Sequence, residues 1–272
     1  MSVQTEIDRI ITAVGAAYDA VEAKGGTAPA AQTIEGLAGA ISGIKSAPTT
    51  PYMEATYVMV GSGIGRPRDH YIRYAKLYNH TEICAYEFAG QGRLENLDFS
   101  DVSNNITAIE SRAFQGAQVN GLVLPNTISA LHSLCFNGAY IATLTVPPLV
   151  TVLQSSAFAY IQPVYNRATG EELPINIILP QNLAKIGNSC FEGAMINQIT
   201  IPDTVTEIGD NAFYACYQLA SITCLAATPP ALGTDAFSSD TAGFTIKGPA
   251  ASVAAYKAAD GWKDYASYIV AM

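Results

Sequence analysis

Apolar residues recur in a fixed order along most of this chain. A phrase in which an apolar residue is followed, after a gap, by phenylalanine occurs seven times, and in six of them a small residue directly precedes the phenylalanine. Successive phenylalanines are 26, 22, 22, 33, 22 and 24 residues apart, and the 33 equals one period of 22 plus an insert of 11 within residues 161–174. Such self-similarity predicts a repeat architecture. The phenylalanines are Phe88, Phe114, Phe136, Phe158, Phe191, Phe213 and Phe237.

Each phenylalanine is followed by a short run in which apolar and polar residues alternate. Four runs end in proline, at Pro125, Pro147, Pro180 and Pro202. Alternation with β-branched residues predicts a short strand, and proline ends the ladder because it has no N–H to donate. One such unit cannot bury its apolar face alone, so we expect the units to stack around a shared core.

The residues that carry this pattern resemble the BspA-type leucine-rich repeat, whose phrase runs roughly I-x-x-I-G-x-x-A-F-x-x-C-x-x-L-x-x-I-x-I-P. The closest unit is VTEIGDNAFYACYQLASITC, at residues 205–224. The resemblance covers about residues 80–250. It implies a parallel-sheet, α/β repeat solenoid of about seven units of ~22 residues. Known members of the family are surface-displayed binding proteins, and the family has no catalytic residues to transfer.

The same resemblance gives roles to the end of the chain and to its cysteines. The closing phrase AAYKAADGWKDYASYI is similar to the family's terminal cap, in which Tyr256, Trp262 and Tyr265 would seal the last repeat. Cys135 and Cys190 fill the small position before phenylalanine, and Cys216 fills the family's own cysteine position. We expect these thiols to pack as small hydrophobic groups.

Residues 1–45 have helical apolar spacing instead. Two apolar stripes, separated by Gly25-Gly26 and a turn with Pro29, predict an α-helical hairpin. The hairpin is too small to be stable alone, so its apolar faces are expected to form an anchoring or oligomer interface. The residues assigned to that interface are Ile7, Ile10, Ile11, Val14, Tyr18, Ile34, Leu37 and Ile41.

The hairpin phrase EIDRIITAVGAAYDAVEAKGGTAPAAQTIEGLAGAISGI resembles a helical segment of bacteriophage tail, baseplate and fibre proteins. This resemblance implies that the helices bind other tail proteins or sister subunits. An arbitrary amphipathic hairpin is the alternative. The domains predicted from the chain as a whole are a hairpin at 1–45, a linker at 46–51, an N-terminal β cap at 52–80, the repeats at 81–250 and a C-terminal cap at 251–272.

Composition narrows the possible partners and locations. The 272 residues are 49% hydrophobic and only 14% charged, against about 25% charged in an ordinary soluble domain. No apolar stretch reaches the ~18 residues of a membrane helix, so no membrane insertion is expected. The net charge of −9 argues against nucleic acid as a partner.

The start MSVQTEIDRI does not resemble a signal peptide. We therefore expect a phage-tail virion protein assembled in the host cytoplasm, or alternatively a bacterial cell-surface or extracellular protein.

The sequence contains few residues in an arrangement that catalysis would require. His70 and His80 have no further ligand-type residues at metal spacing, and His132 falls at a spacer position of a repeat. GSGIG at residues 61–65 lacks the rest of a phosphate-binding motif and predicts a turn. We expect no cofactor and no metal. A basic patch could hold an anionic glycan or a neighbouring subunit, although a solvated face is favoured; it comprises Arg66, Arg68, Arg73 and Lys76.

Binding is expected on the surface of the repeats. Insertions between repeats often lie on the binding side, and tyrosine gives a large contact area with a hydroxyl group. The expected partner is a bacterial surface protein or glycan. The candidate residues are Tyr140, Tyr160, Tyr165, Arg167, Tyr214 and Tyr217.

Three functions follow from these features. The favoured one is a non-enzymatic phage-tail or tail-like particle protein whose repeats bind a host cell-surface molecule. The second is a BspA-like bacterial adhesin or interaction protein outside a virion. The least favoured is an enzyme with its site near His70 and His80.

Overall fold

The structure is a computed structural model that describes residues 56–60, 74–92, 94, 96–101, 104–119, 122–166, 170–237 and 243–272. The chain divides into two compact units, Met1–Met53 and Glu54–Met272, and every described residue lies in the second. The predicted hairpin and linker lie outside the described residues. So do the assigned interface residues Ile7, Ile10, Ile11, Val14, Tyr18, Ile34, Leu37 and Ile41.

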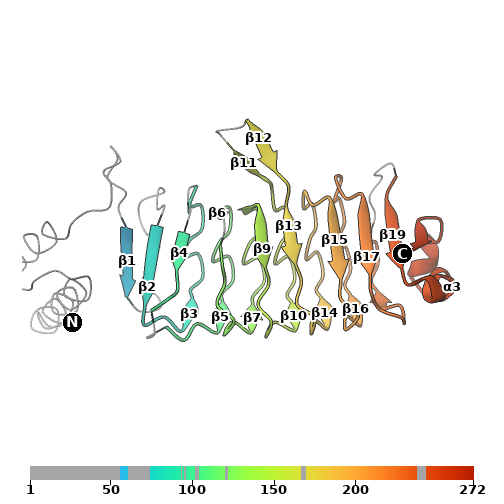
Figure 1. The fold of residues 1–272 in the computed structure, drawn as a ribbon, viewed down its shortest axis with the longest axis horizontal. Helices are drawn as coiled ribbons and strands as arrows, with labels where there is room; N and C mark the ends of the chain where they lie inside the picture. The colour runs from blue at the N-terminus through green and yellow to red at the C-terminus, as the bar shows by residue number, and fades with distance from the viewer. Residues whose placement is uncertain are drawn as a thin grey trace, which may run out of the picture. The chain divides into compact units, whose positions relative to one another are not determined.

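The second unit repeats one kind of turn, which the residues after position 184 illustrate. A two-residue strand is followed by a compact segment around Phe191 and then by a longer strand. Ile186, Phe191 and Ile199 come from these three parts, and all three are buried. Successive turns lie side by side, so their inward side chains form one continuous core (Figure 1).

The two-residue strands form a seven-stranded parallel sheet in the order β18-β16-β14-β10-β7-β5-β3. Within most of these strands the first residue is half-buried and the second is buried, which fits an amphipathic pleat. The strands are β3 (Glu82–Ile83), β5 (Ala108–Ile109), β7 (Ala130–Leu131), β10 (Val152–Leu153), β14 (Lys185–Ile186), β16 (Glu207–Ile208) and β18 (Ala231–Leu232).

The longer strands lie on another side of the turns and form three separate parallel sheets. The first contains β1 (Thr56–Val60), β2 (Tyr74–Tyr78) and β4 (Asn96–Asp98). The second contains β9 (Thr143–Thr145) and β13 (Asn176–Ile178). The third contains β15 (Gln198–Ile201), β17 (Ser221–Cys224), β19 (Thr245–Gly248) and β20 (Ile269–Ala271).

Two further pairs complete the strands. β6 (Gln118–Val119) and β8 (Tyr140–Ile141) form a short parallel pair after the compact segments. β11 (Val164–Asn166) and β12 (Glu171–Leu173) form an antiparallel hairpin within the predicted insert. This hairpin projects from the row of turns directly before β13 (Figure 1).

The repeats are parallel β units, about eight turns of ~23 residues with little helix, and this corrects the α/β units expected from the sequence. The compact segments around Phe88 to Phe213 each contain two left-handed residues, two positions before and two positions after the phenylalanine. Around Phe191 these are Ser189 (φ 53°) and Gly193 (φ 64°). Left-handed residues cannot continue a right-handed helix, so the segments fold as turns. The described helical segments are Ala250–Ser252, α3 (Val253–Ala258) and Trp262–Tyr265.

The seven phenylalanines form one continuous stack through the core. Neighbouring ring centroids lie between 5.0 Å (Phe114 and Phe136) and 5.7 Å (Phe213 and Phe237) apart, and the rings are close to parallel. The equal spacing follows from the repeat, since each turn places its phenylalanine one strand spacing beyond the last. The stack is the clearest result of the 22-residue period.

Aromatic residues of the last segment close the stack. Trp262 is fully buried against Phe237, and its Nε1–H donates to the carbonyl of Pro230 at 2.7 Å. The hydroxyl of buried Tyr256 donates to the carbonyl of Ala226 at 2.9 Å. The hydroxyl of Tyr265 accepts the N–H of Phe237 at 3.3 Å. These contacts satisfy the polar atoms of the aromatic side chains while covering the end of the core.

None of the five cysteines, all of which the structure describes, forms a disulfide bond, and four of them are buried. Cys135 and Cys190 lie beside the phenylalanine stack with no solvent exposure, and burial raises the pKa of both thiols. Burial also raises the pKa of Cys216 and of Cys224 to about 12. Protonated, enclosed thiols are poor nucleophiles, so these four act as packing groups.

Three of the four proline-terminated runs are strands, as the sequence predicts: β9, β13 and β15. The run before Pro125 is the exception. Leu122 and Leu124 are buried and Val123 is 79% exposed, so the alternation is present. This run pairs with no strand among the described residues, because a pleated segment becomes a strand only where a neighbour is close enough for ladder hydrogen bonds.

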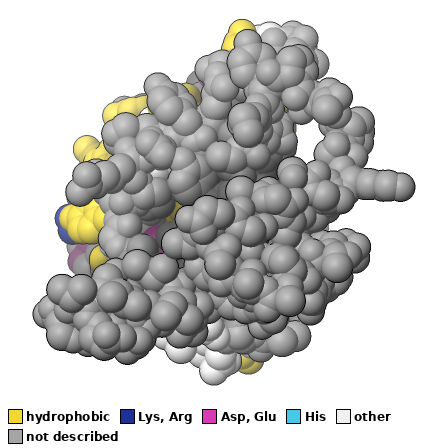
Figure 2. Space-filling model, turned by 90° about the vertical axis from the view of Figure 1, so that its left-hand side faces the viewer, with side chains coloured by type: hydrophobic (Ala, Val, Ile, Leu, Met, Phe, Trp, Pro, Cys, Tyr) yellow, Lys and Arg dark blue, Asp and Glu magenta, His cyan; other side chains and the backbone are white. Residues whose placement is uncertain are grey.

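Part of the apolar composition lies on the surface of the unit. Exposed apolar side chains include Val123, Leu149 and Ile178. The view from the β1 end shows described hydrophobic side chains beside acidic and basic ones at one edge (Figure 2). Among the described helices, none has the length and apolar character needed to cross a bilayer.

Candidate binding surface

The structure places the predicted tyrosines on the surface. Tyr140, Tyr160, Tyr165, Tyr214 and Tyr217 are between 39% and 75% exposed, with Tyr217 the most exposed. The last predicted residue, Arg167, lies outside the described residues. The positions of the five tyrosines are the starting point for the site.

Tyr160 has the most constrained conformation of the group. Its φ of 57° is left-handed, at the position that Gly138 and Gly193 fill in neighbouring turns. A left-handed conformation is strained for a bulky residue and persists only where surrounding contacts stabilise it. Here the hydroxyl of Tyr160 donates to the Oε1 atom of Glu192 at 2.6 Å. That hydrogen bond stabilises the protonated phenol and raises the pKa of Tyr160.

Tyr160 and Tyr214 lie on either side of the same two residues. The N–H of Tyr160 donates to the carbonyl of Glu192 at 2.7 Å, and the N–H of Gly193 donates to the carbonyl of Tyr214 at 2.8 Å. Tyr160, Glu192 and Tyr214 therefore form one group over three consecutive turns, which we call the tyrosine patch. The patch combines aromatic area with one carboxylate.

Two of the other predicted tyrosines belong to strands. Tyr140 belongs to β8, where it pairs with Gln118 and forms a bridge to Gln162. Tyr165 lies in the hairpin, opposite Glu172. Both side chains are exposed, and they belong to other elements than the tyrosine patch.

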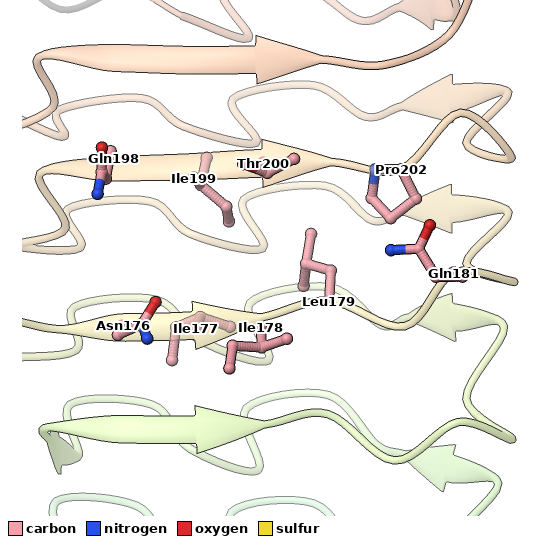
Figure 3. Close-up of a pocket in the computed structure, with 9 residues that line it drawn as sticks. All are labelled: Asn176, Ile177, Ile178, Leu179, Gln181, Gln198, Ile199, Thr200 and Pro202. Carbon is pink, nitrogen blue, oxygen red and sulfur yellow. The ribbon is translucent and has the colours of Figure 1, made fainter.

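A cleft of about 270 Å³ lies between β13 and β15 (Figure 3). It lies where the long-strand ladder is interrupted, because β13 pairs with β9 on one side and β15 pairs with β17 on the other. The hairpin insert immediately precedes β13, so the interruption coincides with the one irregular repeat. The lining residues are Asn176, Ile177, Ile178, Leu179, Gln181, Gln198, Ile199, Thr200 and Pro202.

Sequence reasoning missed the cleft residues. Asn176, Gln198 and Thr200 are exposed residues at alternate strand positions, which the sequence shows as polar residues between apolar ones. The insert before Asn176 was a further signal. Neither signal reveals that the two strands fail to pair, because that depends on their separation in space.

Two of the buried polar residues form a separate pair that is closed to ligands. His80 and Glu87 are buried, and their Nε2 and Oε1 atoms are 3.2 Å apart. The second carboxylate oxygen of Glu87 accepts the N–H of Cys84, and Nδ1 of His80 hydrogen-bonds the carbonyl of Tyr78 at 3.0 Å. Every polar atom of the pair thus has a partner, so this cluster supports the fold and offers no substrate access at His80.

The other charged candidates are paired on the surface. Nε2 of His132 lies 3.4 Å from Oε1 of Glu110, and Nζ of Lys76 lies 3.6 Å from Oδ2 of Asp98. Arg66, Arg68, Arg73, His70 and the GSGIG segment lie outside the described residues. Within the part of the chain that the structure describes, no group of three acidic, histidine or cysteine residues could hold a metal ion.

Comparison with known families agrees with this architecture. Residues 81–173 and 170–249 match the BspA type Leucine rich repeat region, in six copies. The match spans more than half of the chain, and the protein belongs to this family of leucine-rich repeat proteins. The curated proteins compared with the chain gave no match.

Proposed function

We propose that the chain is a non-enzymatic recognition protein whose solenoid binds a molecule of a bacterial cell surface. The observation that carries this proposal is the tyrosine patch. Tyr160 is an exposed aromatic residue whose backbone is left-handed and whose hydroxyl is held by Glu192. A rigid aromatic side chain loses little conformational entropy on binding, so it gives affinity efficiently.

We further propose that the protein is a component of a phage tail or tail-like particle, assembled in the host cytoplasm. The support is the sequence of residues 6–44, which resembles helical segments of tail, baseplate and fibre proteins. In such a particle several copies of one weak binding face act together. The effective concentration then raises affinity without any new contact.

The alternative is a BspA-like adhesin or interaction protein outside a virion. Membership of the BspA-type family favours it, because binding is typical of that family. Both functions need the same recognition surface, and they differ in the role of residues 1–45.

The test of recognition is binding of the labelled full chain to bacterial cells, measured by flow cytometry. We expect saturable binding by the natural chain and at least tenfold weaker binding by the Tyr160→Ala/Tyr214→Ala variant. A Val123→Ala variant is the control, because Val123 is exposed outside the patch. Absence of saturable binding on every strain tested would contradict the recognition proposal.

The test of the particle role uses the predicted interface. Ile7→Asp/Ile11→Asp should abolish incorporation into purified particles while leaving cell binding intact. Ser2→Asp/Thr5→Asp is the control for added charge. If both variants are incorporated as well as the natural chain, the anchor proposal fails. If the natural chain is found on the bacterial surface and never in particles, the adhesin alternative is correct.

A further inference from the structure

The backbone of the cleft between β13 and β15 has polar groups that no ladder uses. In β13, the N–H of Asn176 and the carbonyl of Ile178 bond toward β9, at 2.7 and 2.9 Å. In a parallel strand alternate residues bond to opposite sides, so the N–H and C=O groups of Ile177 face β15. By the same rule the backbone groups of Gln198 and Thr200 face β13, since Asn197 and Ile201 bond toward β17.

These groups do not pair across the cleft. Within the described residues, no backbone hydrogen bond joins β13 to β15, and the two strands belong to different sheets. Backbone donors and acceptors need partners from water or a ligand when a protein partner is missing. The cleft therefore offers unused hydrogen-bonding groups along both of its walls.

The cleft is too narrow for a third strand. Cα atoms of β13 and β15 approach within 8 Å of one another, whereas a strand inserted between two others would need them roughly 9–10 Å apart. An extended peptide cannot enter by completing the sheet. The gap instead admits only small polar groups, such as a water molecule or a hydroxyl group of a ligand that lies over the cleft.

The side chains around the cleft are polar and uncharged. Asn176, Gln181 and Gln198 bring amides, each of which both donates and accepts, and Thr200 brings a hydroxyl (Figure 3). Within the described part of the chain, none of these four side chains has a hydrogen bond of its own. No lining residue is ionisable, so nothing in the cleft would neutralise a charged ligand.

The uncharged character continues beyond the cleft. The outward residues of β9 are Thr143 and Thr145, and the half-buried residues of β17 are Ser221 and Thr223. In a chain of net charge −9, four adjacent strands thus present only hydroxyl, amide and aliphatic groups. We call this surface the uncharged strip; it comprises Thr143, Thr145, Asn176, Ile178, Gln198, Thr200, Ser221 and Thr223.

We propose that a neutral polysaccharide lies over the uncharged strip and that hydroxyl groups of one of its sugar residues enter the cleft. Sugar hydroxyls donate and accept hydrogen bonds, as the amides and unused backbone groups require. Ile178, whose side chain is exposed beside the cleft, supplies an apolar contact for the C–H face of a sugar ring. This inference rests on the proposed recognition function and specifies the class of surface molecule that is bound.

The test is affinity electrophoresis of the full chain in native gels that contain polysaccharide. The neutral probes are dextran, mannan, xylan and the neutral polysaccharide fraction of cells that the chain binds; alginate is the anionic probe. We expect retardation by at least one neutral probe and none by alginate. Asn176→Ala/Gln198→Ala should weaken this binding at least tenfold. Gln154→Ala/Gln218→Ala, which removes two exposed amides outside the cleft, should leave it unchanged.

The possible failures are distinguishable. If the chain binds cells but no neutral polysaccharide retards it, the sugar inference is overturned while the recognition function stands. The sugar inference is also overturned if Asn176→Ala/Gln198→Ala binds the polysaccharide as well as Gln154→Ala/Gln218→Ala does. If the chain binds no cells, the recognition function itself fails. Since alanine at an exposed position can alter the fold, circular dichroism and the unfolding midpoint of each variant are measured alongside the gels. Thr200→Val keeps the shape of the side chain but removes its hydroxyl group, and it should also weaken binding.

Discussion

The ring of Tyr160 occupies the space that a β-carbon on Gly193 would need. A Cβ at residue 193 would lie 2.4 Å from Cδ1 of Tyr160, far closer than such atoms approach. The two residues fill the same repeat position in adjacent turns, and both are left-handed. Glycine at residue 193 thus allows tyrosine at residue 160 to lie flat on the next turn, where its hydroxyl meets Glu192.

Gly193→Ala is expected to destabilise the protein by about 1–3 kcal/mol, because alanine is strained at a φ of 64° and its methyl group would displace the Tyr160 ring. Urea unfolding followed by circular dichroism measures this change. Gly116→Ala is the matched control: its φ is 65°, but nothing lies within 4 Å of the added Cβ. We expect Gly193→Ala to lower the free energy of unfolding more than Gly116→Ala does. Adding Tyr160→Gly to Gly193→Ala should remove this difference. An equal loss of stability in the two single variants would contradict the contact between the Tyr160 ring and residue 193.

The phenylalanine stack should dominate stability. Phe136 is fully buried, with neighbouring ring centroids 5.0 and 5.3 Å away. Phe136→Ala leaves a cavity on both sides and should cost about 3–5 kcal/mol. Val123→Ala, at a residue that is 79% exposed, should change stability by no more than about 0.5 kcal/mol. Similar unfolding midpoints for the two variants would show that the stack is not the core.

Two histidine–glutamate pairs allow a comparison of burial. Removing the Glu87 side chain leaves His80 buried without its partner, so Glu87→Ala should cost about 3–5 kcal/mol. Glu110→Ala breaks the solvent-exposed pair with His132 and should cost about 0–1 kcal/mol. Chemical denaturation of both variants gives the difference, and a small effect at Glu87 would show that water reaches the cluster.

The buried thiols predict a loss of stability in alkaline solution. The pKa values of Cys216 and Cys224 rise from an ordinary value near 9 to about 12 in the folded state. The folded chain therefore keeps protons that the unfolded chain releases, and this contribution is full below pH 9 and is lost as the pH rises toward about 12. Cys216→Ala/Cys224→Ala should flatten the fall in unfolding midpoint between pH 9 and 11. An unchanged slope would contradict this origin.

The repetitive part of the fold could be predicted from the sequence because every turn uses the same inward positions. The spacing of Phe136 and Phe158 sets the stack, and the alternation at residues 198–201 sets a strand. The handedness of the compact segment could not be predicted in this way. Ser189 and Gly193 show that it depends on φ values, which residue patterns indicate only where glycine recurs.

The irregular features of the fold could be recognised only in the three-dimensional structure. The insert at residues 161–174 was visible in the period, but the failure of β13 to pair with β15 depends on the distance between them. Tyr160 stands where neighbouring units have glycine, yet only the structure shows that its ring covers Gly193. His80 appeared as an isolated histidine, because its partner Glu87 reaches it through the fold of the intervening turn.

The most direct test of the recognition account is equilibrium binding of the labelled full chain to bacterial cells, with the tyrosine patch intact and removed. The account predicts saturable binding that falls at least tenfold in the Tyr160→Ala/Tyr214→Ala variant and is unchanged in Val123→Ala. Equal binding by all three chains, or no saturable binding by the natural chain, would contradict it.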